Sequence, residues 1–329
     1  MELILAHHSS FPRIGDGADQ QILRRTIAQW EKGEKTDEDL RAAEERVMEW
    51  ALADQIEAGL DVVTDGQIRW YDPISHLAGK LRGIRINGLL RFFDTNTYFR
   101  QPVVHGPIER AETMVVGDFE FAKAKSSRPV KPVLTGPVTL ARHSIFKDGQ
   151  VGGFEQLVDG YTRALASEVE ALAAAGARLI QIDEPSLVKH PGDLPQAERS
   201  LKALSAAKGG SQLILALYFG DAAPIYERLQ ALPVDALALD FTYSPNLVET
   251  IAAQGSAKQL ALGLVDGRNT RLEDTRTVAR QLEKIAHRLG SARAWLSSSC
   301  GFEYLPRDRA KLKLRHLEAI RQEFLGSAR

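Results

Sequence analysis

Short apolar runs alternate along the chain with longer segments in which apolar residues recur at helical spacing. The runs richest in Val, Ile and Leu predict eight β-strands, at residues 2–7, 61–64, 132–135, 178–182, 212–217, 236–239, 259–264 and 294–297. The periodic segments between them predict helices that include residues 42–58, 154–175, 222–231, 272–289 and 309–324. Such an alternation is typical of a parallel sheet covered by helices.

Eight strands with intervening helices in 329 residues predict an α/β fold of the (β/α)₈ or TIM-barrel type, formed by residues 1–329 as one domain. An open, doubly wound sheet is the alternative, but no Gly-x-Gly-x-x-Gly motif follows the first strand and no phosphate-binding loop is found. Residues 67–131 break the alternation. We interpret them as a β-containing excursion after the second strand that crosses the carboxyl-terminal end of the barrel, called the mouth below.

Composition narrows the class of protein. The 42 Lys and Arg residues nearly balance 43 Asp and Glu residues, which argues against a nucleic-acid or membrane-surface partner. The start of the chain is too short and too acidic for a signal peptide, and no apolar run approaches the length of a membrane span, so we expect a cytoplasmic protein. The single cysteine, Cys300, excludes an intramolecular disulfide and any site built from several cysteines.

Polar residues stand where the predicted strands end, and in a barrel these ends surround the active site. They are His7, His8, Asp65, Gln67, Thr135, Asp183, Glu184, Tyr218, Asp221, Asp240, Asp266, Arg268, Ser299 and Cys300. Asp183 and Glu184 directly follow an apolar strand, so one carboxylate should face the mouth and the other should point outward. The inward one could hold a ligand ammonium or act as a base. A helix-capping aspartate before Pro185 is the alternative.

Several motifs, in order, resemble those of the cobalamin-independent methionine synthase family. They occupy residues 10–15, 59–67, 93–96, 134–139, 180–187, 262–270 and 297–301. The resemblance implies a (β/α)₈ barrel. Full-length family members have two barrels, of which the carboxyl-terminal one carries zinc and homocysteine and the metal-free amino-terminal one helps to hold the folate; shorter relatives with one barrel also exist.

The resemblance extends only in part to the zinc ligands. The family's His-x-Cys pair aligns with Ala216 and Tyr218, whereas its acidic ligand and its last cysteine align with Asp240 and Cys300. Zn²⁺ would therefore need His8 or water to complete a tetrahedral site. Around these positions the sequence is closer to the metal-free amino-terminal barrel, and we expect less than one zinc per chain.

The function that the resemblance implies is a methyltransferase of methionine-synthase type, which moves a methyl group from a methyl-folate or methyl-corrinoid donor to a thiol such as homocysteine. Asp183, Asp240 and Cys300 are the candidate catalytic residues, with Asp240 and Cys300 also the candidate metal ligands. The candidate substrate-binding residues are His8, Ser10, Arg13, Gln67, Glu184, Tyr218, Asp266 and Arg268. Gln67 stands where the family has a substrate-binding acid.

Two other functions remain open from the sequence. One is a metal-free accessory barrel that holds a pterin or methyl donor for a protein partner, either a second barrel or a corrinoid protein. The other is a repurposed enzyme related to uroporphyrinogen decarboxylase, in which Arg13, Arg69 and Arg268 would bind carboxylates.

Overall fold

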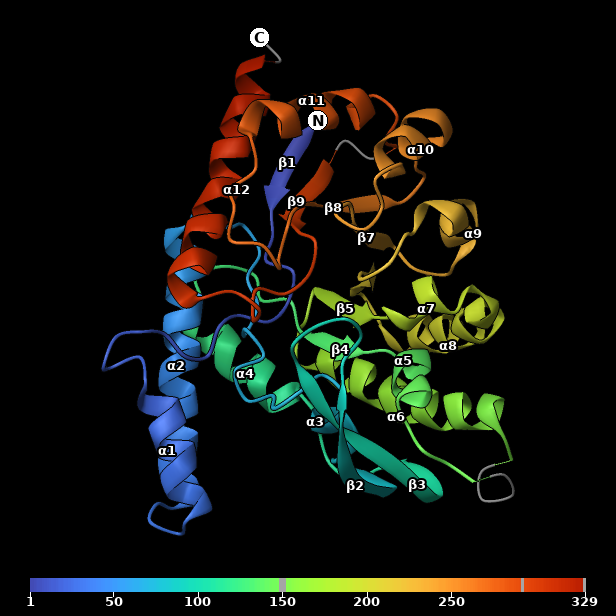
Figure 1. Cartoon of the computed structure of the whole chain (residues 1–329). Coiled ribbons are helices and arrows are strands. Elements are labelled where there is room, and N and C mark those ends of the chain that lie inside the picture. Colours follow the sequence, from blue (N-terminus) through green and yellow to red (C-terminus); the bar gives the residue numbers. More distant parts are fainter. Residues whose placement is uncertain (148–151, 291–292, 328–329) are drawn as a thin grey trace.

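The computed structural model describes residues 1–147, 152–290 and 293–327. Its main sheet is parallel, and neighbouring strands follow the order β1 (Glu2–Leu5), β9 (Arg293–Ser298), β8 (Gln259–Val265), β7 (Ala236–Asp240), β6 (Gln212–Leu217), β5 (Leu179–Asp183) and β4 (Val133–Thr135) (Figure 1). Val62 and Val63 fill the remaining gap, because Val62 pairs with Ala6 beyond β1 and Val63 pairs with Val130 before β4. The predicted (β/α)₈ barrel is thereby confirmed. The strand predicted at residues 61–64 is reduced to these two bridging residues.

Helices surround the sheet. They are α1 (Ile22–Glu31), α2 (Asp37–Glu57), α5 (Pro137–Arg142), α6 (Phe154–Ala174), α7 (Ser186–Lys189), α8 (Leu194–Ala207), α9 (Tyr226–Ala231), α10 (Leu247–Gln254), α11 (Thr275–Ala286) and α12 (Arg307–Ser327), with short 3₁₀ turns at Pro191–Asp193 and Ala223–Ile225. Among these helices, none is both long and apolar enough to cross a membrane.

Local capping explains where the helices differ from prediction. Helix α2 begins before residue 42 because Thr36 and Asp39 form a capping box, in which each side chain accepts from the other residue's backbone N–H. Helix α11 begins at Thr275 rather than 272, because Asp274 caps it by accepting from the Thr277 N–H at 3.1 Å. The helix predicted at 222–231 is divided into a 3₁₀ turn and α9.

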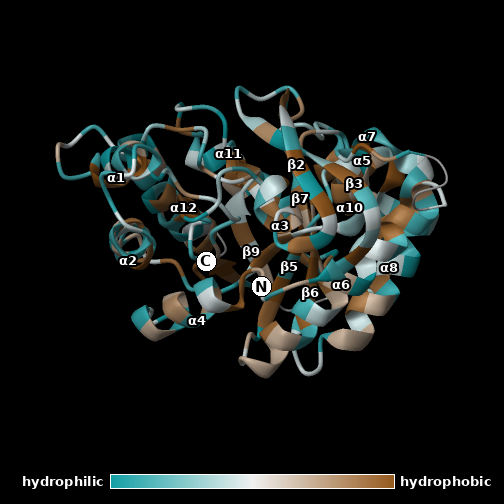
Figure 2. Ribbon diagram, turned by 90° about the horizontal axis from the view of Figure 1, so that it is seen from below, coloured by the Kyte–Doolittle hydropathy of each residue, from teal (hydrophilic) through white to brown (hydrophobic). Residues whose placement is uncertain are grey.

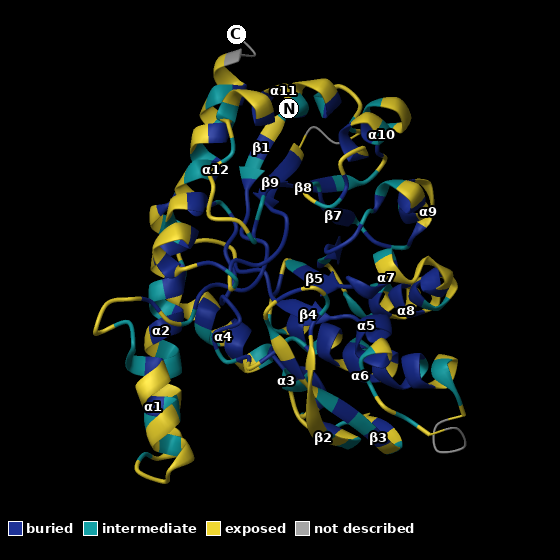
Figure 3. Cartoon of the chain, viewed as in Figure 1, coloured by how far each residue is buried: buried dark blue, intermediate teal, exposed yellow. Residues whose placement is uncertain are grey.

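Alternating side chains divide the core into two layers. On β6, Ile214 and Ala216 face the barrel interior, while Leu215 and Leu217 face the helices. The interior layer consists mainly of small residues together with Trp295. Figure 3 shows the strands buried and the outer helix surfaces exposed, and Figure 2 shows the same division as hydrophobic strands inside hydrophilic helix faces. Small interior residues leave room for polar side chains near the mouth.

The segment between the second and third barrel strands contains α3 (Ser75–Ala78), the antiparallel hairpin β2 (Leu81–Arg91) and β3 (Tyr98–Arg110), and α4 (Val116–Lys125). The hairpin turn approaches the loops that follow three barrel strands. Asp94 accepts hydrogen bonds from the Tyr243 hydroxyl at 2.7 Å and from Arg268 at 3.0 Å, and the Phe93 ring lies 5.7 Å from that of Phe219. These contacts hold the turn beside the mouth.

Candidate active site

Two buried histidines follow β1. His7 Nε2 lies 3.0 Å from the Ser10 carbonyl oxygen, and His8 Nδ1 lies 2.9 Å from the Ser9 hydroxyl. Burial, reinforced by the positive charge of Lys131, lowers the pKa of His7 to about 3 and that of His8 well below its usual value. Both imidazoles are therefore uncharged at neutral pH, so they offer hydrogen bonds but no positive charge to a ligand.

Asp183 ends β5 and points into the mouth as predicted for the inward carboxylate of the pair. Its Oδ1 accepts from Gln181 Nε2 at 2.7 Å and its Oδ2 accepts from the Tyr218 hydroxyl at 3.1 Å. Burial raises the pKa of Asp183 to about 6, although Gln181, Lys131 and Tyr218 act in the opposite direction. A buried carboxylate with a perturbed pKa in a concave region is typical of a functional site.

Glu303 is a second carboxylate at the mouth, and the sequence analysis did not select it. Glu303 is exposed to solvent, yet desolvation by the protein around its carboxylate raises its pKa. The hydroxyls of Tyr304 and Ser10 and the charge of Arg13 oppose that rise. The negative charge of Glu303 also raises the pKa of Asp183. In the sequence, only its position three residues after Cys300 could have marked Glu303 as a candidate. The fold of the loop is what brings its side chain to Ser10.

Other acids selected from the sequence are engaged by the backbone. Asp240 Oδ1 accepts from the N–H groups of Thr242 and Tyr243 at 2.8 and 3.1 Å, and its Oδ2 accepts from Phe219 N–H at 3.1 Å. Glu184 points outward and binds the start of α5, accepting from the backbone N–H groups of residues 138 and 139 at 2.9 and 2.7 Å. The geometry therefore supports loop-holding functions for these two carboxylates rather than ligand contact.

Two of the three arginines of the decarboxylase-like alternative are already paired with carboxylates of this chain. Arg69 is bound by carboxylates, with Asp118 at 2.5 Å and Glu45 at 3.2 Å as two of its partners. Arg268 pairs with Asp94 of the hairpin turn and lies 5.3 Å from the centre of the Phe219 ring. Of the three, only Arg13 forms no ion pair within 4 Å among the described residues, and its guanidinium lies 5.9 Å from the centre of the Tyr71 ring.

Backbone strain also marks the mouth. Among the described residues, the non-glycine positions with positive φ are Gln67 (53°), Phe93 (51°) and Phe219 (64°). Gln67 follows the second barrel strand, Phe93 lies in the hairpin turn and Phe219 follows β6. Left-handed conformations of non-glycine residues are unfavourable and cluster at functional sites. Gln67 is buried there, with its N–H donating to Asp65 at 3.1 Å.

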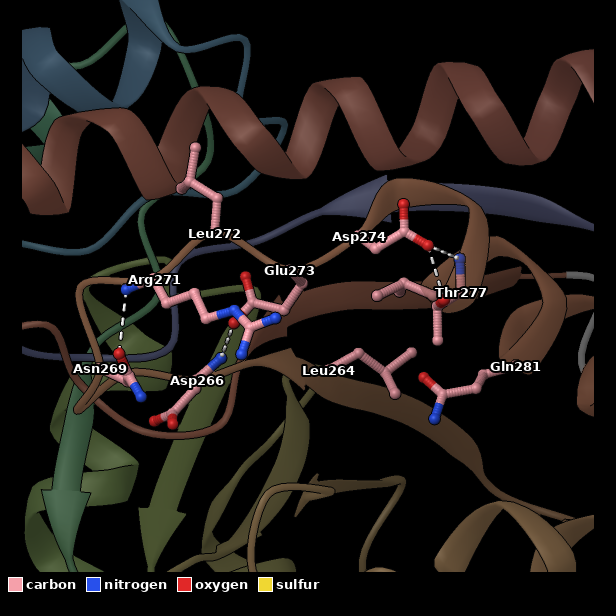
Figure 4. A pocket seen from close by; sticks show the side chains of 10 residues that line it. Leu264, Asp266, Asn269, Arg271, Leu272, Glu273, Asp274, Thr277 and Gln281 are labelled. Carbon is pink, nitrogen blue, oxygen red and sulfur yellow. Dashed lines mark hydrogen bonds between the residues drawn. The ribbon is translucent and has the colours of Figure 1, made fainter.

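A cavity of about 430 Å³ lies beside the mouth (Figure 4). Its lining includes Leu264 on the helix-facing side of β8, Gln281 on α11 and Asp266. Asp266 accepts from the Arg268 N–H at 2.8 Å and raises the pKa of Cys300 through its charge, so it lies between this side cavity and the mouth.

Residues 10–322 match the family model described as "Cobalamin-independent synthase, Catalytic domain". The chain belongs to the cobalamin-independent methionine synthase family. It is 30% identical over 306 residues to a methionine synthase of Saccharolobus solfataricus, covering 92% of this chain and 90% of that protein. It is 31% identical to a 5-methyltetrahydropteroyltriglutamate–homocysteine methyltransferase of Ralstonia pickettii, of which the match spans 42%.

Solved structures of this family share the fold. A B12-independent methionine synthase from Shewanella, solved with selenomethionine, superposes with a TM-score of 0.78 at 21% identity, covering 99% of this chain and 100% of the other. A second such structure, described as a putative enzyme from Listeria monocytogenes, gives 0.78 at 19% identity over 96% of each chain. The predicted family and the predicted enzyme class, a methyltransferase of methionine-synthase type, are confirmed.

The residues at the family's zinc positions do not fit the metal. Ala216 offers no donor atom, and the Tyr218 hydroxyl donates to Asp183. Both oxygens of Asp240 accept from the backbone, and burial raises the pKa of the Cys300 thiol well above its usual value. Within the described part of the chain, no three His, Cys, Asp or Glu side chains are arranged to hold a metal ion. A zinc site needs deprotonated donors in tetrahedral order.

We expect the purified protein to contain well under one zinc per chain, measured by elemental analysis. Cys300→Ser should then change the free energy of unfolding by only about 1 kcal/mol, a value common for point substitutions, because no metal is lost with the thiol. The double substitution Ala216→His and Tyr218→Cys should raise zinc affinity by restoring two donors. One tightly bound zinc per chain that disappears in Cys300→Ser would contradict this prediction.

Proposed function

We propose that this enzyme methylates the thiol of homocysteine and holds the amino-acid end of that substrate with Ser10, Asp183 and Glu303. The observation that supports this proposal is that these three side chains interact electrostatically at one mouth, although Ser10 follows β1, Asp183 ends β5 and Glu303 follows β9. Two carboxylates suit an ammonium group, and the Ser10 hydroxyl can donate to a carboxylate.

Glu303 compensates in this proposal for the acid that Gln67 replaces. A neutral amide at position 67 cannot balance the charge of a substrate ammonium, and Gln67 uses its backbone N–H on Asp65. Glu303 restores a second negative charge from the loop after β9, which is separated only by β1 from the strand that Gln67 follows. Arg13, whose charge lowers the pKa of Glu303, lies close enough to attract the substrate carboxylate.

We propose a methyl-folate of the methyltetrahydropteroyl class as the donor. The Ralstonia relative is named for such a donor. Phe93 and Tyr243 are partly exposed and pack around the buried Phe219 ring beside the mouth, so their rings could stack on a pterin. The hairpin turn carrying Phe93 and Asp94 would then cover the donor, as an excursion over the mouth. A methyl-corrinoid is the alternative donor and is one arm of the test below.

The thiol proton needs an acceptor in the absence of zinc. A free thiol has a pKa of about 8.5, so only a small fraction is thiolate at neutral pH. Desolvation by the surrounding protein raises the pKa of Glu303, which brings this carboxylate closer to the basicity that proton transfer requires. In this proposal Glu303 accepts the thiol proton, and the thiolate sulfur attacks the donor's methyl carbon. The donor nitrogen takes the electron pair of the broken N–C bond together with a proton, so the proton removed from the thiol is balanced by the one that ends on the donor nitrogen.

Glu303→Gln should weaken homocysteine binding by about 10- to 100-fold, the value expected for losing a charged hydrogen bond of about 1.5–3 kcal/mol. Isothermal titration measures the affinity, and mass spectrometry of methionine formed from methyl-folate or methyl-corrinoid measures turnover. Glu112→Gln, an exposed glutamate after β3, is the matched control. Equal affinity of Glu303→Gln and the wild type would refute the assignment of Glu303.

A second candidate function is supported by the missing zinc donors at Ala216 and Tyr218. In it, the chain binds the methyl donor and presents it to a protein partner that carries the metal. Donor binding without methionine formation by the isolated chain, together with turnover after a zinc-containing partner barrel is added, would favour this function.

A further inference from the structure

A buried lysine lies inside the barrel, directly below the mouth. Lys131 precedes β4 and is 5% exposed; its Nζ donates to the His8 carbonyl oxygen at 2.9 Å and to Gln181 Oε1. It lines an interior cavity of about 10 Å³, barely the size of one water molecule. Among the described residues no carboxylate forms an ion pair with it within 4 Å. An ammonium in such a place needs an acceptor and a nearby negative charge.

Gln181 connects this ammonium to Asp183. The two residues are two positions apart on β5, so both side chains point into the barrel. An ammonium can only donate, so the Gln181 carbonyl oxygen must face Lys131 and its NH₂ group must face Asp183. That amide donates to Asp183 Oδ1 at 2.7 Å, and Tyr218 donates to Oδ2 at 3.1 Å. Each hydrogen bond of this network, from Lys131 through Gln181 to Asp183 and from Tyr218 to Asp183, therefore favours Asp183 as an ionised acceptor.

The charges around this network make Lys131 the nearest compensating cation. The positive charge of Lys131 lowers the pKa of Asp183, whereas burial and Glu303 raise it to about 6. Burial lowers the pKa of Lys131 itself to about 7, and the charge of Asp183 opposes that shift. The other titratable groups that interact with this network through their charge or hydrogen bonds are His7 and His8 after β1, Glu184 after β5, Tyr218 after β6 and Glu303 after β9. The two histidines are uncharged and Tyr218 is protonated at neutral pH.

We propose that Lys131 is a positioning residue of the active site, which through Gln181 fixes the orientation of the Asp183 carboxylate and supplies the buried positive charge that keeps it ionised. Its connection to substrate rests on the proposed function, in which Asp183 holds the ligand ammonium. The effect on the carboxylate does not, because it exists in the ligand-free protein.

The test is a titration of Asp183 by NMR, with aspartate ¹³C-labelled at the side-chain carboxyl carbon. Aspartate labelling removes the signals of Glu184 and Glu303. The Asp183 resonance is the one that disappears in Asp183→Asn, which distinguishes it from those of Asp65 and Asp240, whose pKa values are also raised, to about 7 and about 6. In Lys131→Met we expect the midpoint of Asp183 to rise by about one pH unit or more, the effect of losing a neighbouring opposite charge. Lys311→Met, which removes a lysine on α12 that is paired with Asp54 of α2, should leave the midpoint unchanged.

An unchanged Asp183 midpoint in folded Lys131→Met overturns the proposal, even if the variant is less stable, since a purely structural lysine would affect stability alone. If Lys131→Met fails to fold, Gln181→Met decides: it removes the connecting amide, and the midpoint should again rise. Titration of L-homocysteine into the same proteins separates the two proposals. If Lys131→Met shifts the Asp183 midpoint but the wild-type protein does not bind homocysteine, the proposed function is refuted and the positioning of Asp183 by Lys131 still holds.

Discussion

Asp183→Asn is expected to weaken homocysteine binding by about 10²–10³-fold, with a comparable loss in kcat/KM. The side chain is buried, and removing one partner of a buried charged hydrogen bond costs about 2–5 kcal/mol, where each 1.4 kcal/mol is a factor of ten. Asparagine also presents an NH₂ group where Gln181 and Tyr218 both donate, so at least one donor would lose its acceptor. Isothermal titration and initial-rate kinetics measure the two losses.

Asp183→Asn should also change the pH dependence of homocysteine affinity. Burial raises the pKa of Asp183 to about 6, so wild-type affinity should fall as the pH is lowered through about 6, where the carboxylate becomes protonated and no longer attracts an ammonium. In Asp183→Asn this contribution should vanish. Asp235→Asn is the matched control, because Asp235 precedes β7 at the opposite end of the barrel, where it accepts from Lys208. Wild-type affinity in Asp183→Asn would contradict the assignment.

Glu168→Ala is expected to lower the free energy of unfolding by about 3–5 kcal/mol, the cost of breaking a buried charged pair. Glu168 on α6 is fully buried, and its Oε1 accepts from the N–H groups of Met114, Val115 and Val116 at 2.6–3.1 Å. Its Oε2 accepts from Arg110 Nε at 2.8 Å. One carboxylate therefore attaches the end of β3 and the start of α4 to the barrel. Alanine at this position would leave these N–H donors without their acceptor.

Urea denaturation followed by circular dichroism measures this loss. Glu155→Ala is the control on the same helix, because Glu155 is exposed and its ion pair with Arg199 spans 3.6 Å between solvent-exposed side chains. Exposed pairs contribute little to stability. A Glu168→Ala protein no less stable than Glu155→Ala would show that the excursion is attached by its apolar contacts instead.

The barrel itself could be predicted because its signals are local. Apolar runs of about the right length and glycine stops such as Gly176, with φ of 88°, mark the strands and helices without knowledge of the fold. The predicted strand at residues 61–64 shows the limit of that approach. Only two of its residues pair. Each does so through a single bridge, Val62 with Ala6 beyond the end of β1 and Val63 with Val130 before the start of β4.

Predicting the site was harder, because residue type does not reveal which partners a side chain will meet. Asp183 and Asp240 both follow apolar strands, yet Asp183 faces the mouth while Asp240 is held by three backbone N–H groups. Glu303 and Lys131 carried no strand-end signal, and both lie near Asp183 only because the barrel closes.

Residue identity and short-range spacing were sufficient to predict the family, the alternation of strands and helices, and the loss of two zinc donors at Ala216 and Tyr218. The tertiary structure decided which carboxylates remain available to a ligand, where the buried charge of Lys131 is compensated, and how the hairpin turn reaches Arg268. Burial and hydrogen bonding set these properties, and both depend on groups that are distant in the chain and adjacent only after folding.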